Sequence, residues 1–176
     1  MPPRRRRSRT VTLRDGASVT LRPIAPEDKA LLVGVFERLS EQSRYRRFSM
    51  RLRELSPATL AYFTEVDHSD RDAIIALEPT SGEALGVARY VRLSEDPEAA
   101  EIAVAVVDDW HRRGLGPALL TELSSRARHE GIRRFIALVQ ADNRDAMALA
   151  EGVGDSKFRL AGPHLELVIQ LETREE

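Results

Sequence analysis

The sequence predicts an α/β (α+β) fold, in which a mixed central sheet of six to seven strands is flanked by helices. Three observations lead to this prediction. The chain has 176 residues, the size of one domain. Segments with the apolar period of strands alternate with segments that have the period of helices. A long apolar segment at residues 100–107 is followed by a helical pattern and a second apolar segment, and a helical crossover joins parallel strands.

The first half of the chain is predicted to form a hairpin and then helices. The hairpin joins residues 11–14 to residues 19–22 through an Asp-Gly turn. Pro26 opens the first helix, because proline fits the first helical turn and apolar residues then recur on one face. A short helix follows around Tyr45, and Ser56 supplies the N-cap of a third helix.

The second half is predicted to supply most of the sheet. Its central strand is apolar except for one glutamate, as expected of a strand covered on both faces. Gly131 ends the helix that follows this strand, because glycine readily adopts the left-handed conformation of a helix C-terminus. The strands are predicted at residues 73–77, 85–92, 100–107, 135–139 and 165–171.

The composition argues against several classes of function. The 27 basic residues nearly balance the 28 acidic ones, so neither nucleic acid nor a membrane is expected as a partner. The chain lacks cysteine, and its four histidines have no metal-ligand spacing, so no metal is expected. It also lacks an apolar run of about 18 residues and a signal peptide, so the cytoplasm is the expected location. The oligomeric state is left open, with a homodimer among the options.

Arginine is concentrated at the N-terminus, at Arg4 to Arg7 and at Arg9. Such a run could bind nucleic acid or an acidic partner. No aromatic residue interleaves it, however, and the rest of the chain is balanced in charge, so a solvated, disordered tail is the favoured interpretation. We therefore expect a tail at residues 1–9 and a single domain at residues 10–176.

A basic, glycine-bearing turn follows the central strand and precedes a helix that is expected to begin near Pro117. Amide groups at a helix N-terminus attract anions, and glycine lets a phosphate approach the backbone closely. The turn is therefore a candidate pyrophosphate site, although an ordinary strand-to-helix turn would also need glycine. The expected ligating residues are Arg112, Arg113, Gly114, Leu115, Gly116 and Pro117.

This stretch resembles the central motif of the GNAT family of acyl-CoA-dependent N-acetyltransferases. The motif has an apolar strand, an acidic turn, an aromatic residue, Gln/Arg-x-x-Gly-x-Gly/Ala and a helix. Here residues 104–106 are followed by Asp108-Asp109, Trp110 and the sequence His-Arg-Arg-Gly-Leu-Gly at 111–116. Asn143, followed by a helical run, resembles the Asn-x-x-Ala segment of the same family. The resemblance implies the GNAT fold and acetyl-CoA as co-substrate.

The N-terminal third is similar to the acetyltransferase domain of bacterial protein-lysine acetyltransferases, at residues 39–48, 55–57 and 66–71. This similarity implies transfer of acetyl to a primary amine, with a protein lysine as the acceptor. Two alternatives stay open. One is acetylation of a small amine such as an antibiotic or polyamine, and the other is a catalytically silent acyl-CoA-binding module.

Glu101 is the expected general base. An amine with a pKa of about 10.4 must lose a proton before it can attack a thioester. Glu101 is the one carboxylate inside the central strand, and apolar neighbours would raise its pKa. The family resemblance points to the same position. The competing interpretations are an exposed structural glutamate, or a base from the polar cluster of Asp67, His68 and Asp70, which otherwise caps a helix end.

The resemblance also implies contacts with the rest of the donor. The backbone of Ala105 and Val106 would orient the thioester where the strand splays at Val106, and Asn143 would touch the pantetheine arm or the leaving thiol. Three residues depart from the family pattern. His111 takes the Gln/Arg position, Pro117 lacks an amide, and Ala150 replaces a tyrosine that often protonates the thiolate, so the general acid is unassigned.

Overall fold

The computed structural model describes residues 7–48 and 53–171. Within these residues, eight strands form one sheet in the order β1-β2-β3-β4-β5-β6-β8-β7, so the predicted α/β fold is confirmed with a higher strand count. The strands are β1 (Arg9–Thr12), β2 (Ser18–Pro23), β3 (Arg71–Leu77), β4 (Ala84–Arg92), β5 (Ala99–Val106), β6 (Arg134–Gln140), β7 (Asp155–Ala161) and β8 (His164–Gln170).

The additional strand is β7, which the sequence did not reveal. It lies at the edge of the sheet and pairs with β8 alone. Most of its residues are exposed, and charged residues occupy several of its positions. It therefore lacks the apolar alternation by which a half-buried strand is recognised.

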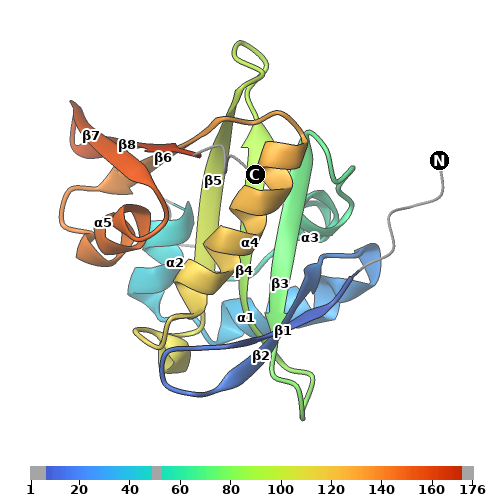
Figure 1. The fold of residues 1–176 in the computed structure, drawn as a ribbon. Helices are drawn as coiled ribbons and strands as arrows, with labels where there is room; N and C mark the ends of the chain where they lie inside the picture. Colours follow the sequence, from blue (N-terminus) through green and yellow to red (C-terminus); the bar gives the residue numbers. More distant parts are fainter. Residues whose placement is uncertain (1–6, 49–52, 172–176) are drawn as a thin grey trace.

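Helices cover both faces of the sheet (Figure 1). Apolar side chains of α1 and α3 pack on one face, and those of α4 and α5 pack on the other. The helices are α1 (Lys29–Glu37), α2 (Glu41–Phe48), α3 (Pro57–Thr64), α4 (Leu115–His129) and α5 (Arg144–Glu151), with short 3-10 turns η1 (Pro26–Asp28) and η2 (Asp108–Trp110). Since α4 crosses from β5 to β6, these two strands are parallel, as predicted.

Three local predictions are confirmed. Pro26 opens η1, which leads into α1. The Ser56 hydroxyl accepts a hydrogen bond from the Thr59 amide at 3.1 Å and caps α3. Gly131, at φ +80°, follows the end of α4.

The predicted N-terminal tail is too long at its C-terminal end. Arg9 already belongs to β1, where it pairs with Leu21, and its guanidinium lies 3.5 Å from the Glu122 carboxylate. Residues 1–6 of the predicted tail lie outside the described residues.

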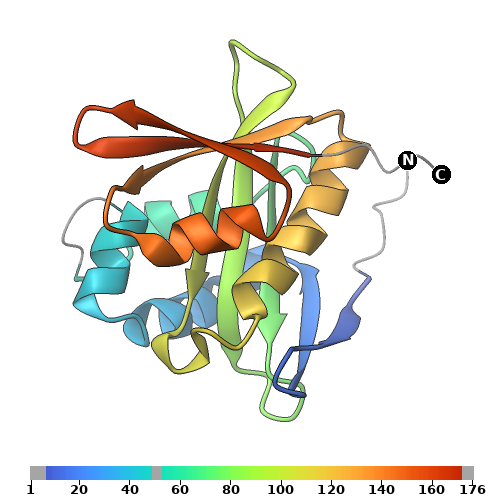
Figure 2. The same ribbon diagram turned by 60° about the vertical axis from the view of Figure 1, so that its left-hand side comes forward.

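The parallel pairing of β5 with β6 is short. It joins residues Ala99, Ala100 and Glu101 to the start of β6 and ends with the pair Glu101–Ile136. From Ile102 to Val106, β5 continues beside β4 alone. Figure 2 shows β6, β8 and β7 turning away from the other strands. The splay therefore begins after Glu101, earlier than the expected Val106, and opens the sheet along half of β5.

Gly86 of β4 allows α4 to pack closely on the sheet. A Cβ atom there would lie 2.8 Å from the Ala105 carbonyl oxygen and 3.1 Å from Leu119 Cδ1. The first distance is shorter than any ordinary contact and involves backbone, which cannot rotate away. Glycine is therefore required by the approach of β5 and α4.

We expect Gly86→Ala to destabilise the protein by ~1–3 kcal/mol, because the added methyl group overpacks the core. The matched control is Gly34→Ala in α1, where a Cβ would meet nothing within 4 Å. Alanine favours the helix there, so the control should be neutral or stabilising. Urea unfolding of both variants measures the effect, and equal stability of Gly86→Ala and wild type would contradict the packing argument.

Candidate active site

The basic turn leads directly into α4, which begins at Leu115 and not at Pro117 as predicted. Gly114 is the N-cap, at φ +93°. The amides of Leu115 and Gly116 are in the first turn, where amides have no partner within the helix. Pro117, in the same turn, has no amide to offer. The helix therefore presents two backbone donors toward the turn.

The two glycines of the turn serve different purposes. Gly114 has a left-handed backbone, and a Cβ there would lie 3.2 Å from Arg14 Nε. Gly116 is helical, and its Cβ would lie 3.4 Å from Leu149 Cδ1 of α5. Gly114 is thus needed for its dihedral angles, whereas Gly116 lies where α4 packs against Leu149 of α5 and a Cβ would make an ordinary contact.

The two arginines of the turn also differ. Arg113 Nε donates to Asp15 Oδ2 at 2.5 Å, and its guanidinium lies 3.7 Å from the centroid of the Trp110 ring. The Ala17 amide and Arg113 together lower the pKa of Asp15. Arg112 is exposed, at φ +59°, and forms no ion pair with the part of the chain that the structure describes. Arg113 is therefore held by the N-terminal hairpin, and Arg112 is the arginine available to a ligand.

The backbone of β5 presents Val106, rather than Ala105, to the splay. The Val107 amide donates to the Leu85 carbonyl of β4 at 2.9 Å. Polar backbone groups alternate in direction along an antiparallel strand, so those of Ala105 also face β4 and those of Val106 face away from it. The Ala105 backbone is thus paired with β4, and its expected contact with the thioester stays a prediction.

His111 is bound to the end of β5. Its Nε2 donates to the Val106 carbonyl at 2.7 Å, which leaves the Val106 amide as the free backbone group at this position. Nearby, Asp108 Oδ1 accepts from the Ser40 amide and the Ser43 hydroxyl, both at 3.1 Å. Burial acts to raise the pKa of Asp108, but these hydrogen bonds outweigh it and lower the pKa. These hydrogen bonds thus connect the acidic turn, which follows β5, to the start of α2.

Glu101 lies where the splay begins, opposite Val91 of β4. Its side chain is exposed, so the expected apolar enclosure is wrong. The physical reason is the splay itself, since β6 leaves β5 just beyond this residue and no longer covers it. Glu101 makes no hydrogen bond or ion pair with the side chains described in residues 7–44 and 53–171, and its own side chain is exposed.

A pocket of ≈ 40 Å³ lies on the same face of the sheet as Glu101, between the helices and strands β4 and β5. Its walls are apolar except for one arginine, and they include the methyl group of Ala105. The lining residues are Leu32, Val35, Phe36, Leu39, Leu55, Phe63, Val87, Arg89 and Ala105. No pattern in the sequence predicted this pocket. The one indication of it was a charged residue, Arg89, in the middle of the otherwise apolar part of β4.

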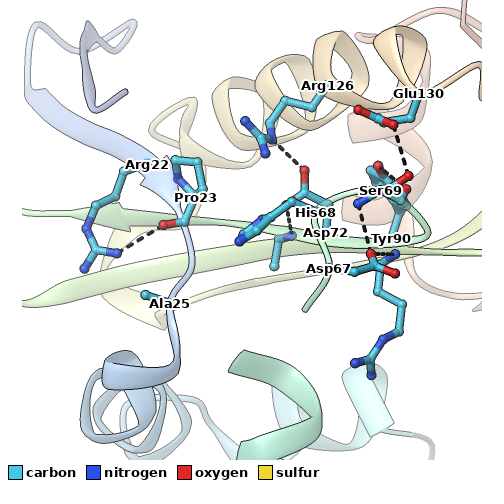
Figure 3. A network of polar contacts seen from close by, with 12 residues as sticks. Arg22, Pro23, Ala25, Asp67, His68, Ser69, Asp72, Tyr90, Arg126 and Glu130 are labelled. Atoms are coloured by element: carbon cyan, nitrogen blue, oxygen red, sulfur yellow. Dashed lines mark hydrogen bonds and ion pairs between the residues drawn. The ribbon is translucent and has the colours of Figure 1, made fainter. Parts of the chain in front are cut away.

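The polar cluster of Asp67, His68 and Asp70 shapes the turn before β3 and does not cap a helix as expected (Figure 3). Asp67 Oδ1 accepts from the amides of Ser69 and Arg71, both at 2.9 Å. Burial acts to raise the pKa of Asp67, but hydrogen bonds from the backbone outweigh it and hold the pKa below its ordinary value of 3.8. Asp70 is bound separately, by Arg92 Nε at 2.7 Å.

The neighbouring Asp72 links β3 to α4 (Figure 3). Its side chain is 1% exposed, accepts from Arg126 Nε at 2.6 Å and lies 2.7 Å from His68 Nδ1. It also accepts from the Ala73 amide. A buried carboxylate with this many partners is a structural anchor, so His68 is engaged in holding the fold.

Asn143 also has a structural role. Its side-chain oxygen accepts from the Ala146 amide at 3.2 Å and caps α5. Ala150, on the same helix, is 1% exposed and packs in the core. Asn143 can still offer its amide nitrogen to a ligand, whereas position 150 supplies no proton donor.

The relationship of this chain to known proteins follows from its match to the model of a protein family. The model of the acetyltransferase (GNAT) family matches residues 35–154. The chain belongs to the GNAT acetyltransferase family. Two solved structures that share this fold are complexes with acetyl-CoA. They are 18% and 19% identical to the chain, with TM-scores of 0.69 and 0.68, respectively.

More similar relatives refine this placement within the GNAT family. The GNAT domain of S. lividans PAT is 30% identical, with a TM-score of 0.85 over 93% of this chain and 96% of that one. Acetyltransferase PA5475 of Pseudomonas aeruginosa is 32% identical over 81% of this chain and 77% of its own length. Acetyltransferase Pat of Mycolicibacterium smegmatis is 33% identical over 82% of this chain, which spans 43% of that relative.

Within the part of the GNAT chain that the structure describes, no helix has the length and apolar character needed to cross a membrane. The same residues contain no group of three or more His, Asp or Glu side chains placed to hold a metal ion.

We expect the Asp67 carboxylate to make stability depend on pH. Its folded pKa lies below the unfolded value of about 3.8, so its contribution is present above that pH and is lost as the pH falls through the folded pKa. Asp67→Asn should therefore reduce the loss of unfolding free energy between pH 7 and pH 3 by ~0.2–1 kcal/mol, a small effect because solvent screens an exposed carboxylate. Urea unfolding at the two pH values measures this, and an unchanged loss would contradict the assignment.

Proposed function

We propose that this GNAT chain transfers acetyl from acetyl-CoA directly to a primary amine, with a lysine side chain of a protein as the acceptor, in the cytoplasm. The single observation that carries the proposal is the splay of β5 from β6. It leaves the Val106 amide, the first turn of α4 and the Glu101 carboxylate facing one open region of the sheet edge. A ligand that lay along β5 would meet all three.

The donor is proposed to bind at the end of β5 and the start of α4. The amides of Leu115 and Gly116 and the guanidinium of Arg112 would receive the pyrophosphate, because both the helix terminus and the cation attract negative charge. The Val106 amide would donate to the pantetheine arm or to the thioester oxygen, where charge develops during attack. Arg113 would position the turn through Asp15 and Trp110 rather than touch the donor.

The reaction requires one proton to move before the acyl group does. Glu101 accepts a proton from the ammonium group, directly or through water, and frees the nitrogen lone pair. The nitrogen attacks the thioester carbonyl carbon, the C–N bond forms, and the C–S bond breaks to release the CoA thiolate. As the amide forms, the nitrogen loses its second proton to water or to the thiolate. Ala150 offers no proton to this thiolate, but a thiol with a pKa of about 8.5 is an adequate leaving group without assistance.

The exposure of Glu101 supports a macromolecular acceptor. A base at the open edge of the sheet can be reached by a lysine on the surface of another protein. The resemblance of residues 39–48, 55–57 and 66–71 to protein-lysine acetyltransferases supports the same acceptor. A small amine is the second candidate, and the pocket beside Ala105 favours it because a compact ligand could enter there. Release of free thiol with a panel of proteins and small amines, with mass spectrometry of the products, distinguishes them.

We expect Glu101→Gln to lower kcat by ~100-fold or more at neutral pH, because glutamine keeps the shape but cannot accept the proton. The Kd for acetyl-CoA should change little. The matched control is Glu98→Gln, since Glu98 is exposed just before β5 and is paired with Arg133 at 3.2 Å. Near wild-type turnover by Glu101→Gln would reject Glu101 as the base, and acetyl-CoA binding without thiol release by the wild type would indicate a silent binding module.

We expect Arg112→Asn to weaken acetyl-CoA binding ~10-fold, or ~1.4 kcal/mol, because asparagine tolerates the left-handed backbone but removes the charge. Binding of acetyl-pantetheine, which lacks the pyrophosphate, should be unaffected. Arg113→Gln is the comparison, and it should reduce stability more than affinity because it breaks the contact with Asp15. Calorimetric titration with both ligands provides the measurement, and equal weakening of the two ligands would rule out a pyrophosphate contact.

A further inference from the structure

Arg89 is the one charged residue that lines the pocket beside Ala105. It pairs with Ala103 across β4 and β5, and Glu101 occupies the diagonal position on the same face of the sheet. Diagonal neighbours on adjacent strands are about 7–8 Å apart, within reach of long side chains. Arg89 therefore lines the pocket and lies on the same face of the sheet as the proposed base.

The surroundings of Arg89 are aromatic and partly buried. Its guanidinium carbon lies 4.2 Å from the centroid of the Phe63 ring and 5.1 Å from that of Tyr62. Burial lowers the pKa of Arg89, whereas Tyr62 acts in the opposite direction. The group still carries its charge, since a guanidinium stays protonated in proteins.

Among the described residues no carboxylate forms an ion pair with Arg89, although the charge of Glu101 acts on it. Arg126, by comparison, is paired with Asp72. Arg71 lies on the same face as Arg89, but it donates to the carbonyls of Tyr62 and Glu65 at 3.3 and 2.8 Å. Removing a cation from water is costly unless an anion compensates it. The site is thus suited to an anionic ligand group.

We propose that Arg89 determines acceptor specificity by binding a carboxylate that the acceptor carries close to its amine. This inference rests on the proposed function, because Glu101 must receive the amine. A carboxylate fits the guanidinium through two parallel hydrogen bonds. Because Arg89 and Glu101 occupy diagonal positions, the acceptor must hold its carboxylate close in space to its amine. The apolar pocket walls take up the carbon atoms between them.

Two sources can supply this carboxylate, and the experiment separates them. One is an acidic residue beside the lysine of a peptide, tested with capped Asp-Lys and Asn-Lys peptides. The other is a small amino acid, tested with β-alanine and β-alaninamide. With acetyl-CoA as donor, we expect wild-type kcat/KM to favour the carboxylate-bearing member of at least one pair by ~10-fold or more.

The Arg89 variants test the origin of that preference. Arg89→Gln should abolish the preference, so that both members of a pair react with similar kcat/KM, while Arg89→Lys should retain part of it. Arg71→Gln is the matched control, since it removes a cation from the same face, and it should keep the preference. Because each variant is measured on both members of a pair, a loss of folded enzyme would lower both rates together and leave the ratio intact.

Four results would overturn the inference. Wild-type turnover without preference in either pair would reject Arg89 as a specificity residue and leave the proposed function intact. A shifted pH–rate profile and equal loss for all acceptors in Arg89→Gln would show that Arg89 acts through Glu101. A preference for succinyl-CoA over acetyl-CoA that Arg89→Gln removes would assign the carboxylate to the donor. No turnover of any acceptor by the wild type would reject the proposed function itself.

Discussion

The parting of β5 from β6 is the constraint on which the rest of the site depends. β5 is joined to β4 by seven register pairs, and β6 is joined to β8 by seven, whereas three pairs join β5 to β6. The molecule therefore consists of two well-paired antiparallel sheets that share a short parallel seam. Beyond the seam, one edge of β5 has backbone groups without a neighbouring strand, and an extended ligand can occupy that edge.

The position of α4 is fixed from both of its ends, so that its N-terminus faces this open edge. Near the N-terminus, Gly86 allows Leu119 to approach the sheet. Near the C-terminus, Arg126 is bound to the buried Asp72 of β3. A helix clamped at two points cannot slide along the sheet, and the geometry between its first turn and the end of β5 is thereby preserved.

The features that could be predicted from the sequence are those encoded by neighbouring residues. The Ser56 cap, the start at Pro26 and the parallel strands around α4 depend on short-range patterns and on the handedness of the crossover. The edge strand β7 was missed because its exposed residues carry no apolar period. The basic turn lies between β5 and α4 as predicted, but the sequence did not separate Arg112 from Arg113, since the partner of Arg113 lies 98 positions away.

The acceptor side of the site, too, could be predicted only as far as neighbouring residues encode it. Glu101 could be singled out as a carboxylate within an apolar strand, but its exposure depends on where β6 departs, and no local pattern determines that point. The pocket around Arg89 is assembled from α1, α3 and two strands. Such a pocket arises from tertiary packing, so a sequence can indicate its unusual charge without revealing what surrounds it.

The contact between Asp15 and Arg113 gives the N-terminal hairpin a part in the chemistry at a distance. The hairpin touches none of the reacting groups, yet it holds one side of the turn that precedes α4, and Arg14 packs over Gly114. The turn is thus held in place by residues of the hairpin, which lie outside the motif that contains the turn. Under the proposed function, loosening of this contact would lower the stability of the turn more than its affinity for the donor, and the rate of acyl transfer from donor already bound would be preserved. Under the proposed function, donor binding and proton transfer thus depend on separate parts of the chain.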